Sequence, residues 1–282
     1  MDISKLGLSR RSVAITAALV GMVSLAIGAH AALNKRALDA AEPVATEQAD
    51  AGRPSRIALV IGNGHYPDAN APLTQSINDA RALTAALRQD GFDVDVVEDA
   101  THDDMSRAIA RLKSMVRPDS VVMLFFGGYG IQAGRESFMI PVDATIWKEA
   151  DVRRDGISVE SVLDAIKENG ACAKLVVLDA SRRNPYERRF RAFSHGLAPI
   201  GAPDNALILT SATPGKVADD ADGQHSVLVS ELLNNLNAQT AAAEAVFNKT
   251  RVAISKATDG AQVPSVSSSL LEDVRFGASA RS

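Results

Sequence analysis

Val121 to Gly130 reads VVMLFFGGYG and Leu175 to Pro185 reads LVVLDASRRNP, and these two stretches decide the fold. Each begins as a short apolar run, which is typical of a strand buried on both faces of a parallel sheet. Each then changes to small and polar residues. Because ligands of open α/β sheets bind beyond the carboxyl ends of the strands, we expect the functional site where these two runs end.

Strand-like and helix-like patterns alternate from Arg56 onward. Further strands are predicted at 57–61, 94–97 and 206–209, and helices are predicted after the capping residues Asn78, Thr101 and Ser158 and over 226–236 and 241–256. Residues 138–142 are expected to form a hairpin arm beside the site, and Leu270 to Phe276 a last edge strand. The alternation predicts an α/β fold, with a mainly parallel sheet of about six strands and helices on both faces.

The two strand ends resemble those of the caspase-like peptidases, in particular their bacterial and metacaspase branch. In that family the first strand ends in Gly-His-Gly and the second in Asp-x-Cys followed by Arg, where this chain has Gly128-Tyr129-Gly130 and Asp179-Ala180-Ser181-Arg182. Other segments match in order and spacing: Ile61-Gly62-Asn63 with Tyr66, Asn78-Asp79-Ala80, Ile140-Pro141-Val142-Asp143, and Gln262-Val263-Pro264 with Ser268-Ser269-Leu270. The resemblance covers about Arg56 to Phe276 and implies a three-layer caspase-like fold.

Both reactive groups of the family are replaced in this chain. By the resemblance, Tyr129 stands in place of the general-base His and Ser181 in place of the nucleophilic Cys, and the amides of Gly130 and Ser181 would form the oxyanion hole. Ser181 is a poor nucleophile without a strong base, and a tyrosine of ordinary pKa, about 10, is a poor base. We therefore expect Tyr129 and Ser181 to hydrogen-bond to each other and the chain to lack cysteine-type peptidase activity.

Three histidines could supply another base for Ser181. His65, His195 and His225 all follow predicted strands, so each lies at the expected edge of the sheet, although each also fits a solvated loop. A Ser–His hydrolase is thus the alternative to an inactive enzyme. Cys172 precedes its strand and is expected at the opposite edge, as a buried structural thiol.

Two acidic residues are expected to bind substrate. In the metacaspase branch, acids line a pocket for Arg or Lys, and the matching positions here are Asp179 and Asp79. Paired carboxylates bind a guanidinium through charge-assisted hydrogen bonds. The alternatives are that Asp79 caps its helix and that Asp179 accepts backbone hydrogen bonds. Arg183 replaces an acidic residue common in the family, so the charge at the pocket entrance differs.

Composition excludes several classes of function. The chain has 282 residues, a net charge of −4 and a pI of about 5.8, so nucleic acid is not an expected partner. The one cysteine allows neither an internal disulfide nor a cysteine-rich zinc site. We predict no cofactor and no metal site. Asp219, Asp220 and Asp222 could bind calcium weakly, although their spacing does not match an EF-hand.

The N-terminus is predicted to direct export. Lys5, Arg10 and Arg11 precede an apolar stretch from Val13 to Leu33, so residues 1–33 read as a cleaved signal peptide or as an uncleaved membrane anchor. Residues 34–55 form an expected flexible linker, 56–277 the caspase-like domain and 278–282 a tail. The domain would then face the periplasm from the inner membrane, or be periplasmic or secreted after cleavage.

The leading functional hypothesis is therefore an exported pseudopeptidase. It would bind a peptide or protein carrying a basic residue in the former active-site cleft. The alternatives are a working hydrolase, with Ser181 as nucleophile and Tyr129 or a loop histidine as base, and a regulator that pairs with an active caspase-like homologue. Caspases associate through the last strand, here expected near Leu270 to Phe276, and an exposed edge strand invites such pairing.

Overall fold

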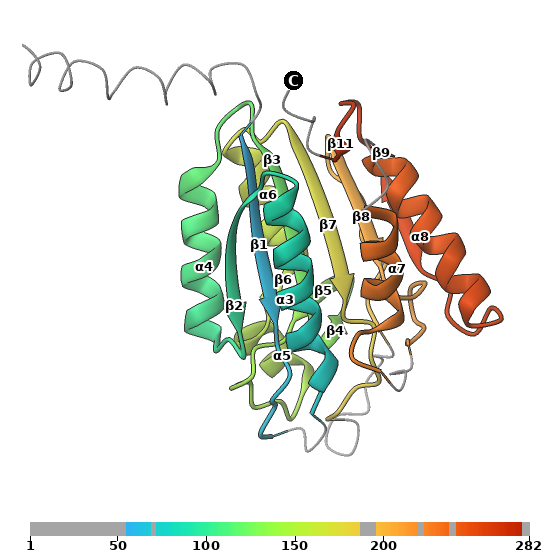
Figure 1. Cartoon of the computed structure of the whole chain (residues 1–282). Coiled ribbons are helices and arrows are strands. Elements are labelled where there is room, and N and C mark those ends of the chain that lie inside the picture. Colours follow the sequence, from blue (N-terminus) through green and yellow to red (C-terminus); the bar gives the residue numbers. More distant parts are fainter. Residues whose placement is uncertain (1–54, 69–71, 187–195, 219–222, 237–240, 278–282) are drawn as a thin grey trace, which may run out of the picture. The chain divides into compact units, whose positions relative to one another are not determined.

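The computed structural model describes residues 55–68, 72–186, 196–218, 223–236 and 241–277. At its centre is a six-stranded sheet in the order β10-β8-β7-β3-β1-β2 (Figure 1). The strands are β1 (Arg56–Gly62), β2 (Asp93–Glu98), β3 (Val121–Gly127), β7 (Ala173–Asp179), β8 (Ala206–Thr210) and β10 (Ser265–Ser268). Of these, β10 alone runs antiparallel to its neighbour. The predicted α/β fold with a mainly parallel sheet is confirmed.

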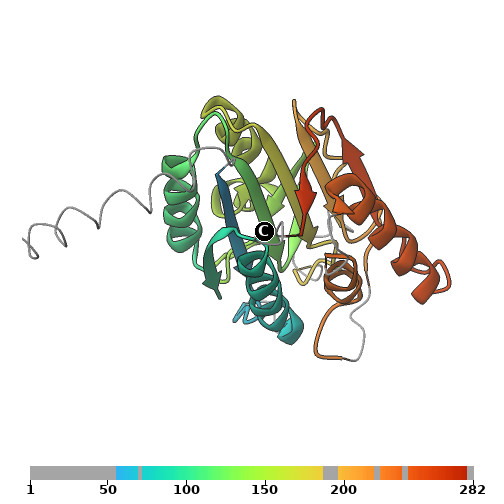
Figure 2. The ribbon, with the colours of Figure 1, turned by 45° about the horizontal axis from the view of Figure 1, so that its top comes forward.

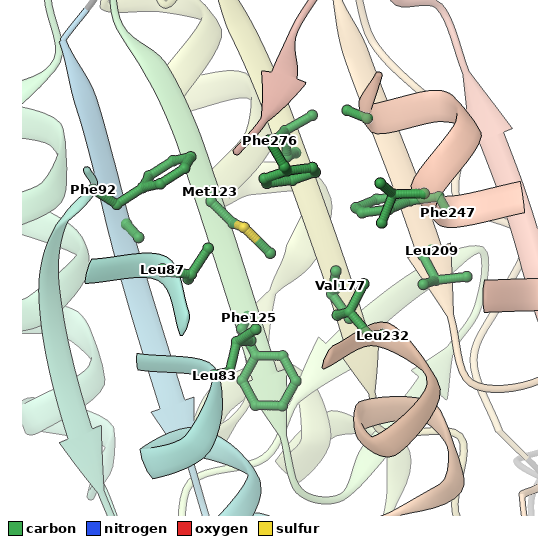
Figure 3. Close-up of a cluster of buried hydrophobic side chains, with 14 of the residues drawn as sticks. Leu83, Leu87, Phe92, Met123, Phe125, Val177, Leu209, Leu232, Phe247 and Phe276 are labelled. Carbon is green, nitrogen blue, oxygen red and sulfur yellow. The ribbon is translucent and has the colours of Figure 1, made fainter. Parts of the chain in front are cut away.

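Helices cover both faces of this sheet, as the alternating pattern predicted (Figures 1 and 2). One face carries α3 (Thr74–Gln89), α7 (Val227–Leu236) and α8 (Ala243–Ala257), and the other carries α4 (His102–Met115) and α6 (Val159–Glu168). Alternate residues of β3 enter the two cores. Met123 and Phe125 join the core beneath α3 (Figure 3), whereas Leu124 and Phe126 join the core beneath α4. Because both faces of the strand are buried, its sequence is apolar throughout.

A small antiparallel sheet lies beyond the carboxyl edge of the main sheet. It consists of β4 (Gly130–Ala133), β5 (Glu136–Met139) and β6 (Ile157–Ser158), and α5 (Glu149–Asp155) precedes β6. The expected hairpin arm is confirmed in β5, although this strand ends at Met139. The sequence did not predict β4, β6 or α5, because elements this short carry too few residues for a periodic pattern.

The predicted last edge strand over Leu270 to Phe276 is wrong. The edge strand on this side of the main sheet is β10, and β11 (Arg275–Phe276) pairs instead with β9 (Ala241–Ala242) in a separate two-stranded sheet. Leu271, between β10 and β11, is 88% exposed and donates its amide to Asn205 Oδ1 at 2.8 Å. Phe276, the apolar residue at the end of this segment, packs near Phe92, with the two ring centroids 6.4 Å apart.

Two of the three predicted helix caps are confirmed. Thr101 Oγ1 accepts the Asp104 amide at 3.2 Å, and the Asp104 carboxylate accepts the Thr101 amide at 3.2 Å, which completes a capping box at the start of α4. Ser158 Oγ accepts the Ser161 amide at 3.2 Å at the start of α6. In both helices a local hydrogen bond sets the first turn, so the sequence was sufficient to locate it.

The predicted cap at Asn78 is wrong, because α3 begins earlier, at Thr74. Leu73 occupies the N-cap position and its side chain makes no capping hydrogen bond. The first turn packs closely on β1 instead: a Cβ atom at Gly62 would lie 2.6 Å from the Ser76 carbonyl oxygen. The start of this helix thus coincides with a contact to the sheet. No local sequence pattern encodes that contact.

Among the described residues, no helix is both long and apolar enough to cross a bilayer. The predicted signal peptide or anchor (1–33), the linker up to residue 54 and the tail (278–282) lie outside the described residues. Those assignments stay predictions.

Candidate functional site

The two strand ends identified from the sequence lie next to each other, at the edge of the sheet near β4, β5 and α5 (Figure 1). β3 and β7 pair in parallel, with Gly127 opposite Asp179. Beyond this pair, the Gly128 amide donates to the Asp179 carbonyl at 3.2 Å and the Gly130 amide donates to the Ala180 carbonyl at 2.9 Å. The fold thus brings both predicted segments together, and the catalytic roles assigned to their residues stay predictions.

Ser181 is enclosed immediately after β7. Ser181 is only 1% exposed, and its Oγ atom has no hydrogen-bond partner among the described residues. Its amide donates to Ser211 Oγ at 3.2 Å, and its carbonyl accepts the Ala218 amide at 2.7 Å. The expected hydrogen bond between Tyr129 and Ser181 is therefore wrong. Backbone contacts hold Ser181 in place, and no base among the described residues hydrogen-bonds to its hydroxyl.

Tyr129 belongs to an aromatic cluster rather than to a dyad with Ser181. It is 5% exposed, and its ring packs edge-on against Tyr66, with ring centroids 4.8 Å apart and planes at 67°. The Tyr129 amide donates to Tyr66 Oη at 3.1 Å, and Tyr66 Oη donates to the Ile140 carbonyl at 3.0 Å. Burial raises the pKa of Tyr66. Tyr66 matched the family by sequence, but the sequence did not reveal that it supports Tyr129.

Both predicted oxyanion donors already have acceptors within the chain. The Gly130 amide is engaged by Ala180 and the Ser181 amide by Ser211. A ligand oxygen would have to replace these acceptors to use the two amides. The approach at Gly130 is close, since a Cβ atom there would lie 2.5 Å from Leu197 Cδ2 and 2.7 Å from the Ala180 carbonyl oxygen. Only glycine fits this position without displacing its neighbours.

Asp79 lies inside α3 and does not cap it, because the helix begins at Thr74. Asp79 is 1% exposed; its carboxylate accepts the Ser226 amide at 3.2 Å and contacts His225 Nδ1 at 2.8 Å. Burial and, next, the charge of Asp179 raise the pKa of Asp79 from 3.8 to about 6. The two acids are therefore close enough for the charge of Asp179 to raise the pKa of Asp79.

Asp179, the last residue of β7, is paired with a buried arginine. Arg182 Nη2 lies 3.3 Å from Asp179 Oδ1, and both side chains are almost fully enclosed. Asp179 Oδ2 has no hydrogen-bond partner among the described residues. Arg183, which follows, is exposed. The buried acids are thus accompanied by a buried cation, Arg182, whose pairing with Asp179 the sequence did not reveal.

The candidate histidines occupy different surroundings. His65 Nδ1 lies 2.6 Å from Asp99 Oδ2 and its side chain is 69% exposed, whereas the side chain of His225 is 30% exposed and contacts Asp79. His225 is therefore not the solvated loop residue expected from the sequence. No sequence signal could have found this pair, since 146 positions separate the two residues. His195 lies outside the described residues.

Cys172 precedes β7 and so lies at the opposite end of that strand from Ser181, as expected. It is partly exposed rather than buried, and desolvation raises the pKa of its thiol. Within the described part of the chain, no group of three or more histidine, cysteine or acidic side chains could hold a metal ion. The acidic segment Asp219 to Asp222 lies outside that part, so the weak calcium alternative stays a prediction.

Comparison with known protein families gives one match that covers most of the chain. Residues 55–275 match the Caspase domain family. A solved structure, that of caspase-1 from Spodoptera frugiperda, superposes with a TM-score of 0.57. The superposition covers 80% of this chain and 91% of that one at 16% sequence identity, which supports the shared fold alone.

Two curated mammalian proteins match part of the chain. The human mucosa-associated lymphoid tissue lymphoma translocation protein 1 and its mouse homologue are each 30% identical to it over 136 residues. The matched region is 47% of this chain and only 16% of either relative.

Proposed function

The chain belongs to the caspase family, and from that premise we propose that it is a pseudopeptidase. It binds a peptide or protein through a basic side chain and does not cleave it. The observation that carries this proposal is the state of Ser181, whose Oγ atom is buried without a hydrogen-bond partner among the described residues. A serine hydroxyl needs an adjacent base to become a nucleophile. None of the described residues places a base against it, so proton removal from Ser181 by these residues would be inefficient.

The buried acids support the preference for a basic ligand. Asp79 and Asp179 interact electrostatically, and Arg182 is the cation that pairs with Asp179. With both acids ionised, these three groups carry a net negative charge. Asp179 Oδ2 remains available as an acceptor, since it has no partner among the described residues. A guanidinium or ammonium group would satisfy that buried oxygen and offset the excess charge.

One contact favours a second candidate function, a serine hydrolase. Asp79 contacts His225 Nδ1 at 2.8 Å, which is how a carboxylate orients the base of a serine-dependent triad. In this alternative, the other ring nitrogen of His225 would take the proton of Ser181 after a movement that brings the two together.

Catalysis is tested with the purified protein and peptides that end in Arg, Lys or Asp, with and without calcium. Wild type, Ser181→Ala and the double variant Tyr129→His with Ser181→Cys are compared. We expect only the double variant to cleave, because it restores the family's base and nucleophile in an intact frame. Cleavage by wild type that Ser181→Ala abolishes would establish the hydrolase instead.

Binding is measured separately, by fluorescence anisotropy of an Arg-containing peptide and its Gln counterpart. We expect the Arg peptide to bind at least tenfold more tightly, since a fully desolvated charge pair is worth about 2 kcal/mol or more. Asp179→Asn should remove this preference, whereas Asp273→Asn, on the surface away from the site, should retain it. Equal binding of both peptides by wild type would refute the proposed recognition.

We further propose that the domain is exported. The support is the placement of Lys5, Arg10 and Arg11 before the apolar stretch from Val13 to Leu33. A fusion of alkaline phosphatase after the domain should be active, because that enzyme requires an oxidising compartment, and it should become inactive when residues 1–33 are deleted.

A further inference from the structure

A pocket of about 480 Å³ opens on the face of the sheet opposite α3, and its lining contains none of the candidate-site residues Asp79, Tyr129, Asp179 and Ser181. Its lining residues come from α4, β5, α5, β6 and α6. Its apolar lining is contributed by Ile109, Phe138, Ile157, Val162 and Ala165. The remaining lining residues are mostly polar or charged, so the pocket combines an apolar surface with polar groups that could orient a small molecule.

Some of the charged residues around the pocket have ion-pair partners and others do not. Arg153 Nη1 lies 2.9 Å from Glu136 Oε2, and its Nη2 donates to the Ala133 carbonyl at 2.9 Å. Lys113, half-buried in the last turn of α4, forms no ion pair with any residue that the structure describes. Arg153 Nη2 also lies 3.1 Å from Glu149 Oε1, so Arg153 is shared by two carboxylates, whereas Lys113 is a lining cation with no ion pair among the described residues.

Hydroxyl groups complete the polar part of the lining. Ser106 on α4 and Ser161 on α6 both line the pocket, and neither hydroxyl is hydrogen-bonded to another described residue. Lys113 is two turns further along α4 than Ser106 and on the same side of the helix. The polar groups of Ser106 and Lys113 therefore lie on one side of the pocket, along α4.

We propose that this pocket binds a small amphipathic carboxylate. Its anionic group pairs with Lys113, and its apolar body lies against Phe138 and Val162. A cation has no unsatisfied carboxylate to bind here, because Glu136 is already paired with Arg153. A neutral apolar molecule would leave Lys113 without a counter-ion. Free fatty acids and N-acylated amino acids share the required chemistry, and the site is independent of the peptide-binding proposal.

The test measures binding to the full chain by calorimetry, with octanoate, N-acetyl-leucine, octanol and octylamine as probes. We expect a carboxylate to bind about tenfold more tightly than octanol, and octylamine not to bind. The first two probes distinguish a fatty-acid ligand from an acylated amino acid. Equal binding of octanoate and octanol, or no binding of either carboxylate, would overturn the proposal.

Two variants locate the site. Lys113→Glu should weaken carboxylate binding about tenfold or more, because it reverses the one unpaired charge. Lys249→Glu, an equivalent change at an exposed position on α8, should leave binding unaltered. Ser161→Trp, at an exposed position on the rim, should block the pocket without altering the core. If circular dichroism shows both pocket variants folded and both still bind as wild type does, the assignment is wrong.

Discussion

Asp79 is a buried carboxyl group whose ionisation destabilises the folded protein. Its pKa is raised to about 6, so the folded protein holds this proton more tightly than the unfolded chain does. The contribution of Asp79 to stability is therefore most favourable at acidic pH and declines as pH rises from about 4 to about 6. We expect the free energy of unfolding of wild type, relative to Asp79→Asn, to fall by up to about 3 kcal/mol across this window in urea titrations.

His225 supplies the control for this prediction. Its hydrogen bond lowers the pKa of Asp79, although burial and Asp179 outweigh it. His225→Ala should therefore move the decline in stability to higher pH. Parallel stability profiles of wild type and Asp79→Asn between about pH 4 and pH 7 would contradict the assignment of a raised pKa to this residue.

Among the helices, α4 offers the clearest test of a local signal. Thr101 and Asp104 form its capping box, and the acidic residues of the first turn interact favourably with the positive end of the helix dipole. Thr101→Ala leaves the Asp104 amide without its side-chain acceptor and should destabilise the domain by about 1 kcal/mol. Ser114→Ala, on the exposed face of the same helix, should change the unfolding midpoint little. A negligible effect of Thr101→Ala in chemical denaturation would show that packing on β1 and β2 sets this helix start as well.

At the level of the whole molecule, one open edge of the main sheet is β10, and the segment after it does not extend that sheet. β10 pairs with β8 on one side, and no described strand pairs with its other side. The Ser269 amide donates to Ala206, so by the alternation of an antiparallel ladder the Ser268 amide points outward. If the chain pairs with a second caspase-like chain through this edge, Ser268 lies in the shared ladder.

We expect light scattering to show self-association of wild type at micromolar concentration. Ser268→Pro should abolish it, because proline removes the outward amide. Ser268→Ala retains that amide and should associate as wild type does. A wild type that remains monomeric at high concentration, or a Ser268→Pro variant that still associates, would exclude pairing through β10 between copies of this chain.

Much of the fold could be predicted because its signals are local. The apolar run VVMLFF identifies a strand buried on both faces, and Thr101 and Ser158 identify helix starts. The start of α3 could not be found in this way, since it coincides with close packing of Ser76 on Gly62. The edge strand was misplaced for a similar reason. Which segment adds to the sheet depends on the neighbouring strand, and here β8 pairs with β10.

For the candidate site, the sequence alone was enough to predict that the two strand ends meet, which the structure confirms, and the family resemblance predicts that Tyr129 and Ser181 stand in place of the reactive residues. The strand ends meet because β3 and β7 are adjacent and parallel, with Gly127 opposite Asp179. The apolar runs and the family resemblance were sufficient to predict this. The tertiary structure alone decided the environment of each group: His225 against Asp79, Arg182 against Asp179, and Ser181 Oγ enclosed without a described partner. The physical reason is that periodicity records only which face of an element is buried. A hydrogen bond between side chains 146 positions apart depends on the order of the strands and the packing of the helices on them.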